Sequence, residues 1–591
     1  MRALVAGAIL ALLATPANAA LLFTGFTPGL PDSGGADAFE ITNTGPASVP
    51  LANVSVTGGE GRLGFDPGAT LAAGAHIVVT TNATAYSLAA RHEADYAPAD
   101  ANGTTRVLDA GFALGHDGDD LRLEDASGIA DVVVWGDSTH AGPGWNGPPL
   151  NATGSRLRWF TRTPGQDSDT KADWEQPRQA RLGWRLPETP TFPVQSGVAF
   201  VAPDSSRAMV LDVLLRASSS LRLNVYEFLD VGVANDLLDH MRAHAGLEVR
   251  LLVDENPVGM SAEARLVRDR ILRDLEEAGA QVHLMQHARY AYDHAKYAVV
   301  DDRWVLVQSE NLVSGALPTD ARHGNRGWGL ALDAPTLAQS LAGVFDEDFA
   351  LDPYGARELS DDEPAPVPLP TFVSDAPHPR LEPASGYAFN ATLATSPESL
   401  MGDGDPLLDA IARARHEILV EQLNVPPTWR DAAGRDWPNE YLNALVEAAR
   451  RGVQVRLLLD GHFLDAEGSP NDNAATLRSL ESPGRLLPIQ GRLMRDPDEG
   501  VLHVKGVVID GQSSWVGSMN WNLNSVAQNR EVSLLVDAKP FAELFADAFE
   551  SDWDRAQEQP STRSPVPGLG FPLVAIVITL AGFAFARRRA S

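Results

Sequence analysis

Short runs in which apolar and polar residues alternate fill the first part of the chain, residues 20–184. Clear examples are FEITN at 39–43, HIVVT at 76–80, DLRL at 120–123 and DVVVW at 131–135. Alternation places successive side chains on opposite faces of a strand, and turn residues separate the runs at short spacing. This pattern is typical of an all-β sandwich, so we predict one for residues 20–184.

The pattern changes from residue 194 onwards. Strand-like apolar runs alternate there with helical periodicities, which predicts an α/β architecture. Proline-rich segments at 185–193 and 356–372 indicate linkers, because proline favours an extended chain. The linkers divide the α/β part into a first lobe, residues 194–355, and a second lobe, residues 373–556.

Both ends of the chain carry targeting patterns. Residues 1–19 combine a charged start, a short apolar run and small residues, which predicts a signal peptide cleaved after Ala19. A stalk at 557–568 leads to an apolar segment at 569–586 that is long enough to span a bilayer. The basic tail at 587–591 would stay on the cytoplasmic side. We therefore expect an exported protein, anchored in the membrane by its C-terminus with the body outside.

Composition narrows the function classes. The chain has 591 residues, a formal net charge of −31 and no cysteine. Disulfides, thiolate metal sites and cysteine nucleophiles are excluded. An acidic surface repels phosphate backbones, so nucleic acid as a partner is disfavoured although a local basic pocket is allowed.

The two α/β lobes carry the same motifs. VRLLVD at 249–254 matches VRLLLD at 455–460, and both lobes contain His-x-Lys-x4-Asp followed by Ser-x-Asn, with the same offset from His to Ser. A repeat of this length predicts a pseudo-symmetric pair of lobes. The repeated residues are His294, Lys296, Asp301, Ser309 and Asn311 in the first lobe, and His503, Lys505, Asp510, Ser518 and Asn520 in the second.

The repeated residue types suit a phosphate group. In a strand, residues i and i+2 point to the same face, so each His projects beside its Lys. The lysine would repel a metal cation and attract an anion, so we expect no metal and no cofactor. Two converging copies would let one His attack phosphorus while the other protonates the leaving oxygen. Lysine, serine and asparagine would stabilise the charge on the remaining oxygens.

His-x-Lys-x4-Asp followed by Gly-Ser-x-Asn, in duplicate, resembles the phospholipase D superfamily, including its cardiolipin synthase-like members, over about residues 194–556. The resemblance implies two αβα-sandwich lobes that share one active site and form a covalent phosphohistidine. It also implies roles for the repeated residues: His294 and His503 as the catalytic pair, Lys296, Lys505, Ser309, Ser518, Asn311 and Asn520 as phosphate ligands, and Asp301 and Asp510 as structural residues that hold a strand end or pair with a nearby base.

The family also keeps a carboxylate that hydrogen-bonds a catalytic His. Glu531, in Asn-Arg-Glu at 529–531, matches it and is expected to hold His294, which would make His294 the nucleophile and His503 the acid; the reverse assignment is equally defensible. The first lobe departs, with Gln308 in place of the usual Gly and Gly327 in place of the acid. We therefore expect His503 to lack a carboxylate partner, which raises the prospect of a slow or inactive enzyme.

Two glutamates have two possible interpretations, and the remaining candidates are expected to have ordinary structural roles. Glu227 and Glu421 end predicted strands and are either site residues or solvated strand ends. Tryptophans near the motifs are expected in the core, and three histidines have no counterpart in the second lobe and are expected to be ordinary. These are Trp304, Trp328, Trp515 and Trp521, and His283, His287 and His323.

Residues 20–184 resemble the lamin-tail domain family through FEITN at 39–43, GDDLRL at 118–123 and DSDTKADW at 167–174. The resemblance implies an immunoglobulin-like sandwich that binds a surface ligand, with Asp-rich loops that are either solvated turns or calcium sites. PGLGF at 567–571 resembles archaeal C-terminal sorting signals, in which the helix is either retained or exchanged for a lipid.

Three functions follow from these patterns. The first is a membrane-tethered phosphodiesterase or phosphatidyltransferase acting on phospholipid. The second is an extracellular metal-independent nuclease, for which Arg322 and Arg326 would supply a basic rim. The third is a non-catalytic surface-binding protein in which the β-sandwich is the functional part.

Overall fold

The structure, a computed structural model, describes residues 21–28, 37–58, 61–90, 92–97, 106–107, 112–115, 117–140, 142–150, 158–163, 165–174, 180–181, 189–287, 289–319, 323–351, 355–359, 381–400, 404–430, 436–462, 473–480, 487–495 and 500–556. These residues belong to two compact units that divide between Arg185 and Leu186. The division falls inside the predicted linker at 185–193.

The first unit is an all-β sandwich, as the alternating pattern predicts. One sheet has the order β13 (Ala180–Arg181), β12 (Arg158–Thr161), β1 (Leu21–Thr27), β2 (Ala38–Asn43), β7 (His76–Thr80), β8 (Tyr96–Ala97), β9 (Arg106–Val107), and the other has the order β11 (Gly128–Gly136), β10 (Gly118–Asp125), β4 (Ser55–Gly58), β5 (Gly61–Gly64). A two-stranded pair, β3 (Val49–Pro50) and β6 (Thr70–Leu71), and the helices α1 (Ala83–Ala90) and η1 (Lys171–Asp173) complete it. Both sheets contribute to one apolar core. The immunoglobulin-like and lamin-tail assignments stay predictions.

Acidic residues near the end of this sandwich surround a buried arginine. Arg162 donates to both oxygens of Asp131 at 2.6 and 2.7 Å and to Asp167 at 3.1 Å. Asp169 lies close to the same carboxylates. The guanidinium therefore supplies a positive charge next to these acids. Their clustering does not by itself indicate a bound cation.

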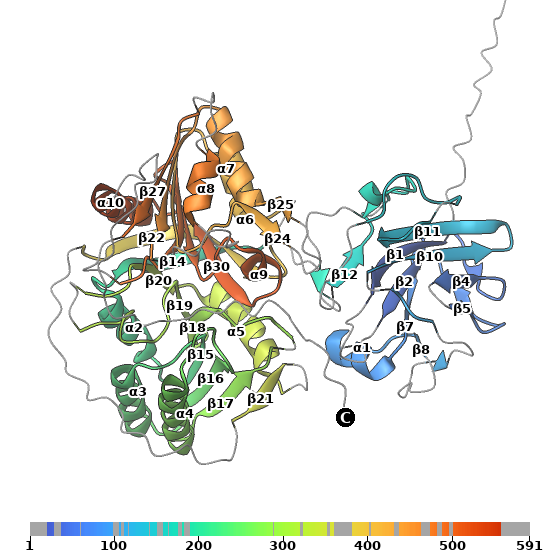
Figure 1. Cartoon of the computed structure of the whole chain (residues 1–591). Helices are drawn as coiled ribbons and strands as arrows, with labels where there is room; N and C mark the ends of the chain where they lie inside the picture. Colours follow the sequence, from blue (N-terminus) through green and yellow to red (C-terminus); the bar gives the residue numbers. More distant parts are fainter. Residues whose placement is uncertain are drawn as a thin grey trace, which may run out of the picture. The chain divides into compact units, whose positions relative to one another are not determined.

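The second unit is built on one sheet of fifteen strands (Figure 1). Its order is β21 (Ala356–Glu358), β17 (Gln281–Met285), β16 (Glu248–Asp254), β15 (Ser220–Val225), β18 (Lys296–Val300), β19 (Trp304–Gln308), β20 (Gly327–Asp333), β14 (Thr191–Ala202), β22 (Ala384–Ser396), β30 (Glu531–Val536), β29 (Ser513–Gly517), β28 (Lys505–Ile509), β23 (Glu417–Gln422), β26 (Gln454–Asp460), β27 (Ile489–Met494). Apart from the edge strand β21, the order is symmetric about the antiparallel pair β14 and β22, so each lobe contributes seven matching strands. The predicted pseudo-symmetry is therefore present in the strand order.

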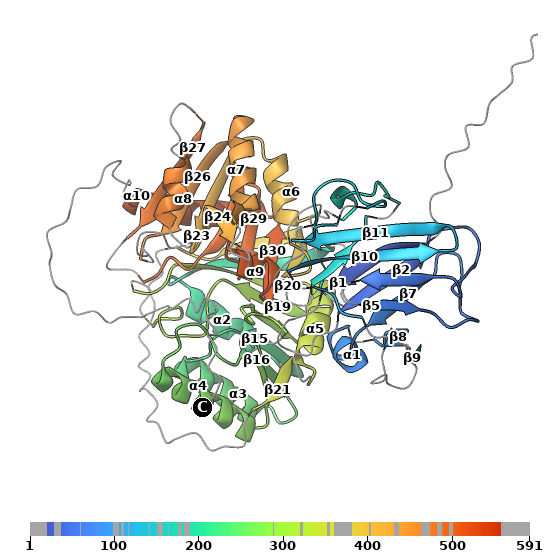
Figure 2. The same cartoon turned by 45° about the vertical axis from the view of Figure 1, so that its right-hand side comes forward.

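Helices cover both faces of this sheet. In the first lobe, one face of the sheet is covered by α2 (Ser206–Leu214), α3 (Val231–Ala243) and α4 (Ala262–Glu277). In the second lobe it is covered by α6 (Pro406–Arg413), α7 (Glu440–Arg450) and α8 (Asn473–Leu480), as Figure 2 shows. On the other face, α5 (Pro335–Phe349) and α10 (Lys539–Arg555) share one core with strands of both lobes. A short helix α9 (Leu523–Ala527) and a hairpin of β24 (Thr428–Arg430) and β25 (Asp436–Pro438) complete the unit.

Local sequence explains why these segments form as they do. In β15, Leu221, Leu223 and Val225 alternate with polar residues and all enter the outer core of the first lobe. Ser261 precedes α4, and its side-chain oxygen accepts from the backbone N–H of Ala264, which is a standard helix cap. Periodicity and capping together therefore account for the positions of strand and helix.

The structure shifts two predicted boundaries. β14 begins at Thr191, inside the predicted first linker, because its N-terminal end pairs with β22. β21 lies inside the predicted linker at 356–372, because it pairs with β17 at the edge of the sheet. Short edge strands carry little hydrophobic pattern, which explains why β21 was missed.

The predicted targeting segments at 1–19, 557–568, 569–586 and 587–591 lie outside the described residues. Among the residues described above, no helix combines the length and apolar character needed to cross a membrane.

Two buried arginines connect the lobes crosswise. Arg326 of the first lobe donates to Asp552 of α10 in the second at 2.6 and 3.0 Å, and to Asp204 at 2.7 Å. Arg530 of the second lobe donates to Asp348 of α5 in the first at 3.0 Å. Both guanidiniums are almost completely buried. Arg326 is therefore a structural residue. Its guanidinium is buried and paired with two acids, so it does not form the basic rim that a nuclease would need.

Replacing Arg326 by Met should destabilise the α/β unit by about 3–5 kcal/mol, because the buried carboxylates of Asp204 and Asp552 would lose the positive charge that lies between them. Urea unfolding of the full chain, followed by tryptophan fluorescence, measures the change. Arg242→Met is the matched control, since Arg242 and its partner Asp239 are both well exposed and should lose less than about 1 kcal/mol. Equal losses in the two variants would contradict the connecting role of Arg326.

Candidate active site

The two lysines of the duplicated motif begin matching strands. Lys296 opens β18 and Lys505 opens β28, and each donates to the carbonyl oxygen of the His two residues earlier, at 2.6 and 2.7 Å. Both lysines are 1% exposed. Burial lowers the pKa of Lys296 to about 8 and that of Lys505 well below its ordinary value. Two buried cations that also repel one another favour an anionic ligand.

The histidines are brought together by backbone bonds between the lobes. The N–H of His294 donates to the carbonyl of Arg530 at 2.9 Å, and the N–H of His503 donates to the carbonyl of Arg326 at 2.8 Å. These are the same arginines whose side chains connect the lobes. Each lobe therefore positions the histidine of the other, and the two copies of the motif form a single site.

Glu531 holds His294, as the sequence predicts. Nδ1 of His294 lies 2.9 and 3.0 Å from the two carboxylate oxygens, and the side-chain amide of Asn529 donates to Glu531 at 3.0 Å. Burial lowers the pKa of His294 to about 4, against the attraction of Glu531. His294 is therefore neutral at physiological pH.

His503 also has a carboxylate partner, which corrects the expectation from sequence. Nδ1 of His503 lies 3.2 Å from Oε1 of Glu310, which is 2% exposed. Burial and the neighbouring Lys505 lower the pKa of His503, and Glu310 opposes them. Glu310 is the middle residue of the first Ser-x-Asn motif, so the signal was an acid where the second lobe has Met519.

The serines and asparagines of the motif lie in the turns beside the histidines. The Ser309 and Ser518 hydroxyls accept from the backbone N–H of Trp328 and Val532 at 3.0 and 3.1 Å. Both serines are fully buried, while Asn311 and Asn520 are 7% and 8% exposed. The asparagines are therefore more accessible than the serines, whose hydroxyls also hold the neighbouring strand.

Asp301 and Asp510 hold strand ends, the first of the two predicted alternatives. Asp301 accepts from the backbone N–H groups of residues 218–220, and Asp510 from those of residues 415–417. Their φ angles of 51° and 52° are in the left-handed region. These N–H bonds lower the pKa of both carboxylates against the effect of burial.

Asp254 and Asp460 are positioning residues that sequence reasoning did not single out. Asp254 accepts from the backbone N–H of Asp293 at 2.7 Å, and Asp460 accepts from that of Leu502 at 3.0 Å. Asp293 and Leu502 immediately precede the two histidines of the motif. The signal was available, because both acids end the repeated VRLLVD and VRLLLD segments.

The same two acids bind a further histidine in each lobe. His287 lies 2.8 Å from Asp254, and His462 lies 3.1 Å from Asp460. His287 therefore has a spatial counterpart, contrary to expectation, because the equivalent place is filled from a different segment. His283 stacks on Phe349, an ordinary packing role.

Glu227 and Glu421 differ in placement, and neither is a solvated strand end. Glu227 accepts from the side-chain amide of Asn311 at 2.7 Å, and burial raises its pKa. Glu421 is fully buried beside Asp552, and burial raises its pKa well above the ordinary value. Glu227 thus adjoins the site, whereas Glu421 is on the side of α10.

Three of the four tryptophans near the motifs are buried packing residues, as expected. Trp328, Trp515 and Trp521 are buried. Trp304 is partly exposed, and the Arg216 guanidinium lies 4.3 Å from its ring centre. Arg322 lies outside the described residues.

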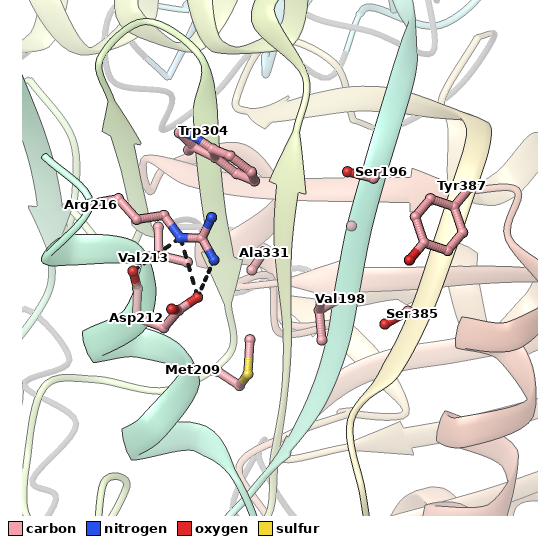
Figure 3. Close-up of a pocket in the computed structure, with 11 residues that line it drawn as sticks. Ser196, Val198, Met209, Asp212, Val213, Arg216, Trp304, Ala331, Ser385 and Tyr387 are labelled. Carbon is pink, nitrogen blue, oxygen red and sulfur yellow. Dashed lines mark hydrogen bonds and ion pairs between the residues drawn. The ribbon is translucent and has the colours of Figure 1, made fainter.

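A cavity of about 180 Å³ lies elsewhere in the α/β unit, lined by residues of the first lobe and of β22 (Figure 3). Met209 and Asp212 of α2, Arg216 just after this helix, and Trp304 line one side, and Tyr387 of β22 lies across the cavity. Among the described residues, its lining includes none of the duplicated motif side chains. The site is therefore defined by the motif geometry and not by this cavity.

Comparison with known families agrees with the geometry. The family described as "Cardiolipin synthase, PLD-like domain" matches residues 210–349 and 407–553, one match in each lobe. Both lobes are therefore similar to phospholipase D-like domains of the cardiolipin synthase type.

Individual relatives fall in the same class. The probable cardiolipin synthase YwiE of Bacillus subtilis (strain 168) is 25% identical over 370 residues, covering 60% of this chain and 64% of the relative. Cardiolipin synthase A of Edwardsiella ictaluri (strain 93-146) is 26% identical, covering 61% and 68%. The matches thus span about two thirds of these relatives. The crystal structure of phosphatidylserine synthase from Haemophilus influenzae Rd KW20 is similar at 13% identity and a TM-score of 0.45, covering 62% of this chain and 89% of that one. A TM-score this low supports no conclusion about function.

A phosphate-like anion should bind between the two lysines. Saturating tungstate, at about 100 times its Kd, should stabilise the chain by about 2.7 kcal/mol and raise Tm accordingly. Lys505→Met should abolish the shift, whereas Lys539→Met, on the exposed face of α10, should retain it. An unchanged shift in Lys505→Met would place the anion elsewhere.

Proposed function

We propose that the protein is an exported, membrane-tethered phosphodiesterase or phosphatidyltransferase that acts on phospholipid through a covalent phosphohistidine. The observation that carries the proposal is the crosswise arrangement of two histidines, each with a buried carboxylate, around two buried lysines. This arrangement combines a nucleophile, an acid and an anion cradle in one site.

The proposed reaction has two steps. Nε2 of His294 attacks phosphorus, forming a P–N bond while the P–O bond to the leaving group breaks. His503 gives its proton to that oxygen, so an alcohol leaves and His503 becomes neutral. His503 then takes a proton from water or an acceptor alcohol, whose oxygen attacks phosphorus and breaks the P–N bond. Water gives hydrolysis, and an alcohol gives transfer.

Electrostatics favour His294 as the nucleophile. Its pKa of about 4 keeps it neutral, and its two contacts with Glu531 fix Nδ1 as the protonated nitrogen. Nε2 then carries the free lone pair. His503 has a single, longer carboxylate contact. The looser partner suits a group that must gain and lose a proton in each cycle.

Charge and family favour a lipid over a nucleic acid. The net charge of −31 opposes binding of a polyanion, and Arg326 is unavailable as a basic rim. The relatives named above are cardiolipin synthases. The predicted signal peptide and C-terminal anchor would hold the body at a membrane surface outside the cell.

Histidine variants test the shared site. His294→Ala and His503→Ala should each lower phospholipid headgroup release or exchange by about 10²–10⁴-fold or more, with EDTA present. His244→Ala, an exposed histidine of the first lobe, should keep full activity. Cleavage of single- or double-stranded DNA without lipid turnover would instead indicate a nuclease.

A good leaving group tests which histidine is the nucleophile. With bis(p-nitrophenyl) phosphate, release of p-nitrophenolate needs little proton donation. His503→Ala should therefore still release about one equivalent in a rapid burst, whereas His294→Ala should release none. The opposite pattern would reverse the two roles.

The pH dependence follows from the two histidines. kcat/KM should fall as pH drops through about 4, where His294 becomes protonated. It should also fall as pH rises through a value below about 6.5, because burial lowers the pKa of His503 and its proton is then lost. A mildly acidic optimum for kcat/KM is expected, and activity that is flat up to pH 9 would contradict the assignment.

A further inference from the structure

The two lobes differ at two positions that lie beside each other in space. The turn after β19 reads Ser309-Glu310-Asn311, and the turn after β29 reads Ser-Met519-Asn. β20 begins with Gly327, and β30 begins with Glu531. One lobe thus has Glu and Gly where the other has Met and Glu.

Strand register shows that Gly327 and Glu531 are equivalent. The N–H of Ser309 donates to the carbonyl of Trp328, and the N–H of Ser518 donates to that of Val532. Gly327 and Glu531 are the residues immediately before these two carbonyls. In addition, Gly327 pairs with Ala202 at the end of β14, and Glu531 with Ser396 at the end of β22. The lost acid and the gained acid are therefore both identified in the structure and not only by alignment.

Glu310 occupies the space that a side chain at position 327 would need. A Cβ atom added at Gly327 would lie 2.4 Å from Cγ and 2.5 Å from Oε1 of Glu310. The equivalent residue in the second lobe points elsewhere, because Met519 is buried in the outer core near Tyr441. The glycine and the glutamate in the first lobe are thus sterically interdependent.

In both lobes an asparagine side chain donates a hydrogen bond to the carboxylate. The side-chain amide of Asn529 donates to Glu531, and that of Asn325 donates to Oε2 of Glu310 at 3.3 Å. Both asparagines stand two residues before the strand position that carries Glu531 or Gly327. Each carboxylate then contacts the histidine of the opposite lobe.

We propose that Glu310 is the positioning residue for His503, a carboxylate moved from the start of β20 to the adjacent turn, with Gly327 as the residue that makes room for it. Both halves of the site are then equipped for catalysis, and the departure of the first lobe from the usual motif is a relocation and not a loss. The inference rests on the proposed function, in which His503 exchanges a proton with the leaving and attacking oxygens.

The sharpest test transplants the second-lobe arrangement into the first lobe. Glu310→Met should lower kcat/KM about 10²-fold or more for a phosphodiester with an alkyl alcohol leaving group, and less than about tenfold for the bis(p-nitrophenyl) phosphate burst. Glu310→Met with Gly327→Glu should recover activity to within about tenfold of the unmodified chain, because the acid returns to the position that Glu531 has. Gly327 does not have a positive φ, so its backbone accepts glutamate.

The pH profile separates positioning from packing. Charges that face His503 are Glu310, Lys505 and Lys296. Glu310→Gln keeps the shape but removes the negative charge, so the alkaline limb of kcat/KM should move to lower pH, while Glu310→Asp should leave it near its original place. Circular dichroism and Tm show whether Glu310→Met folds. If it does not, Glu310→Gln tests the role of Glu310 in its place.

Two results would overturn the inference: a Glu310→Gln enzyme with an unmoved alkaline limb, or a folded double variant no more active than Glu310→Met. Failure of the underlying function would look different. In that case His294→Ala and His503→Ala would keep their activity, whereas loss of activity in both histidine variants with an unaffected Glu310→Met would refute only the role of Glu310.

Discussion

The active site depends on two buried arginines that cross between the lobes. Arg326 and Arg530 each bind an acid on the last helix of the opposite lobe, and each offers its backbone carbonyl to the N–H of the opposite histidine. A buried guanidinium that loses its partners is costly, so the lobes cannot shift without breaking these contacts. The same two residues therefore fix the relation of the lobes and the distance between His294 and His503.

Burial within this closed arrangement sets the chemistry. Removing water lowers the pKa of both histidines and of both lysines, and the neighbouring carboxylates oppose this effect. A bound phosphate would oppose the effect of burial, because its negative charge would stabilise the positive charge on the lysines. Anion binding and protonation of these lysines are therefore expected to depend on each other.

The residues that sequence reasoning found are those that belong to the repeated segments. His294, Lys296 and their second-lobe counterparts lie together, and Glu531 contacts His294 as predicted. Errors arose where the repeat is imperfect. The motif predicts the acid at position 327, whereas the structure has it at Glu310, and Arg326 is buried although the sequence allows it a surface role. In both cases the decisive contact is with the other lobe, which a linear motif does not contain.

Alternation, periodicity and a repeat with constant spacing are local properties, so the sequence alone predicts the β-sandwich unit and the duplicated α/β lobes. Through the family resemblance it also predicts His294 and His503 as the catalytic pair. The folded structure adds the carboxylate partner of His503, the close approach of Glu310 to Gly327, and the connection of the lobes by Arg326 and Arg530. These features depend on strand register and on packing, and the contacts between the lobes join residues more than a hundred positions apart. A side chain's partner there is set by geometry and not by its neighbours along the chain.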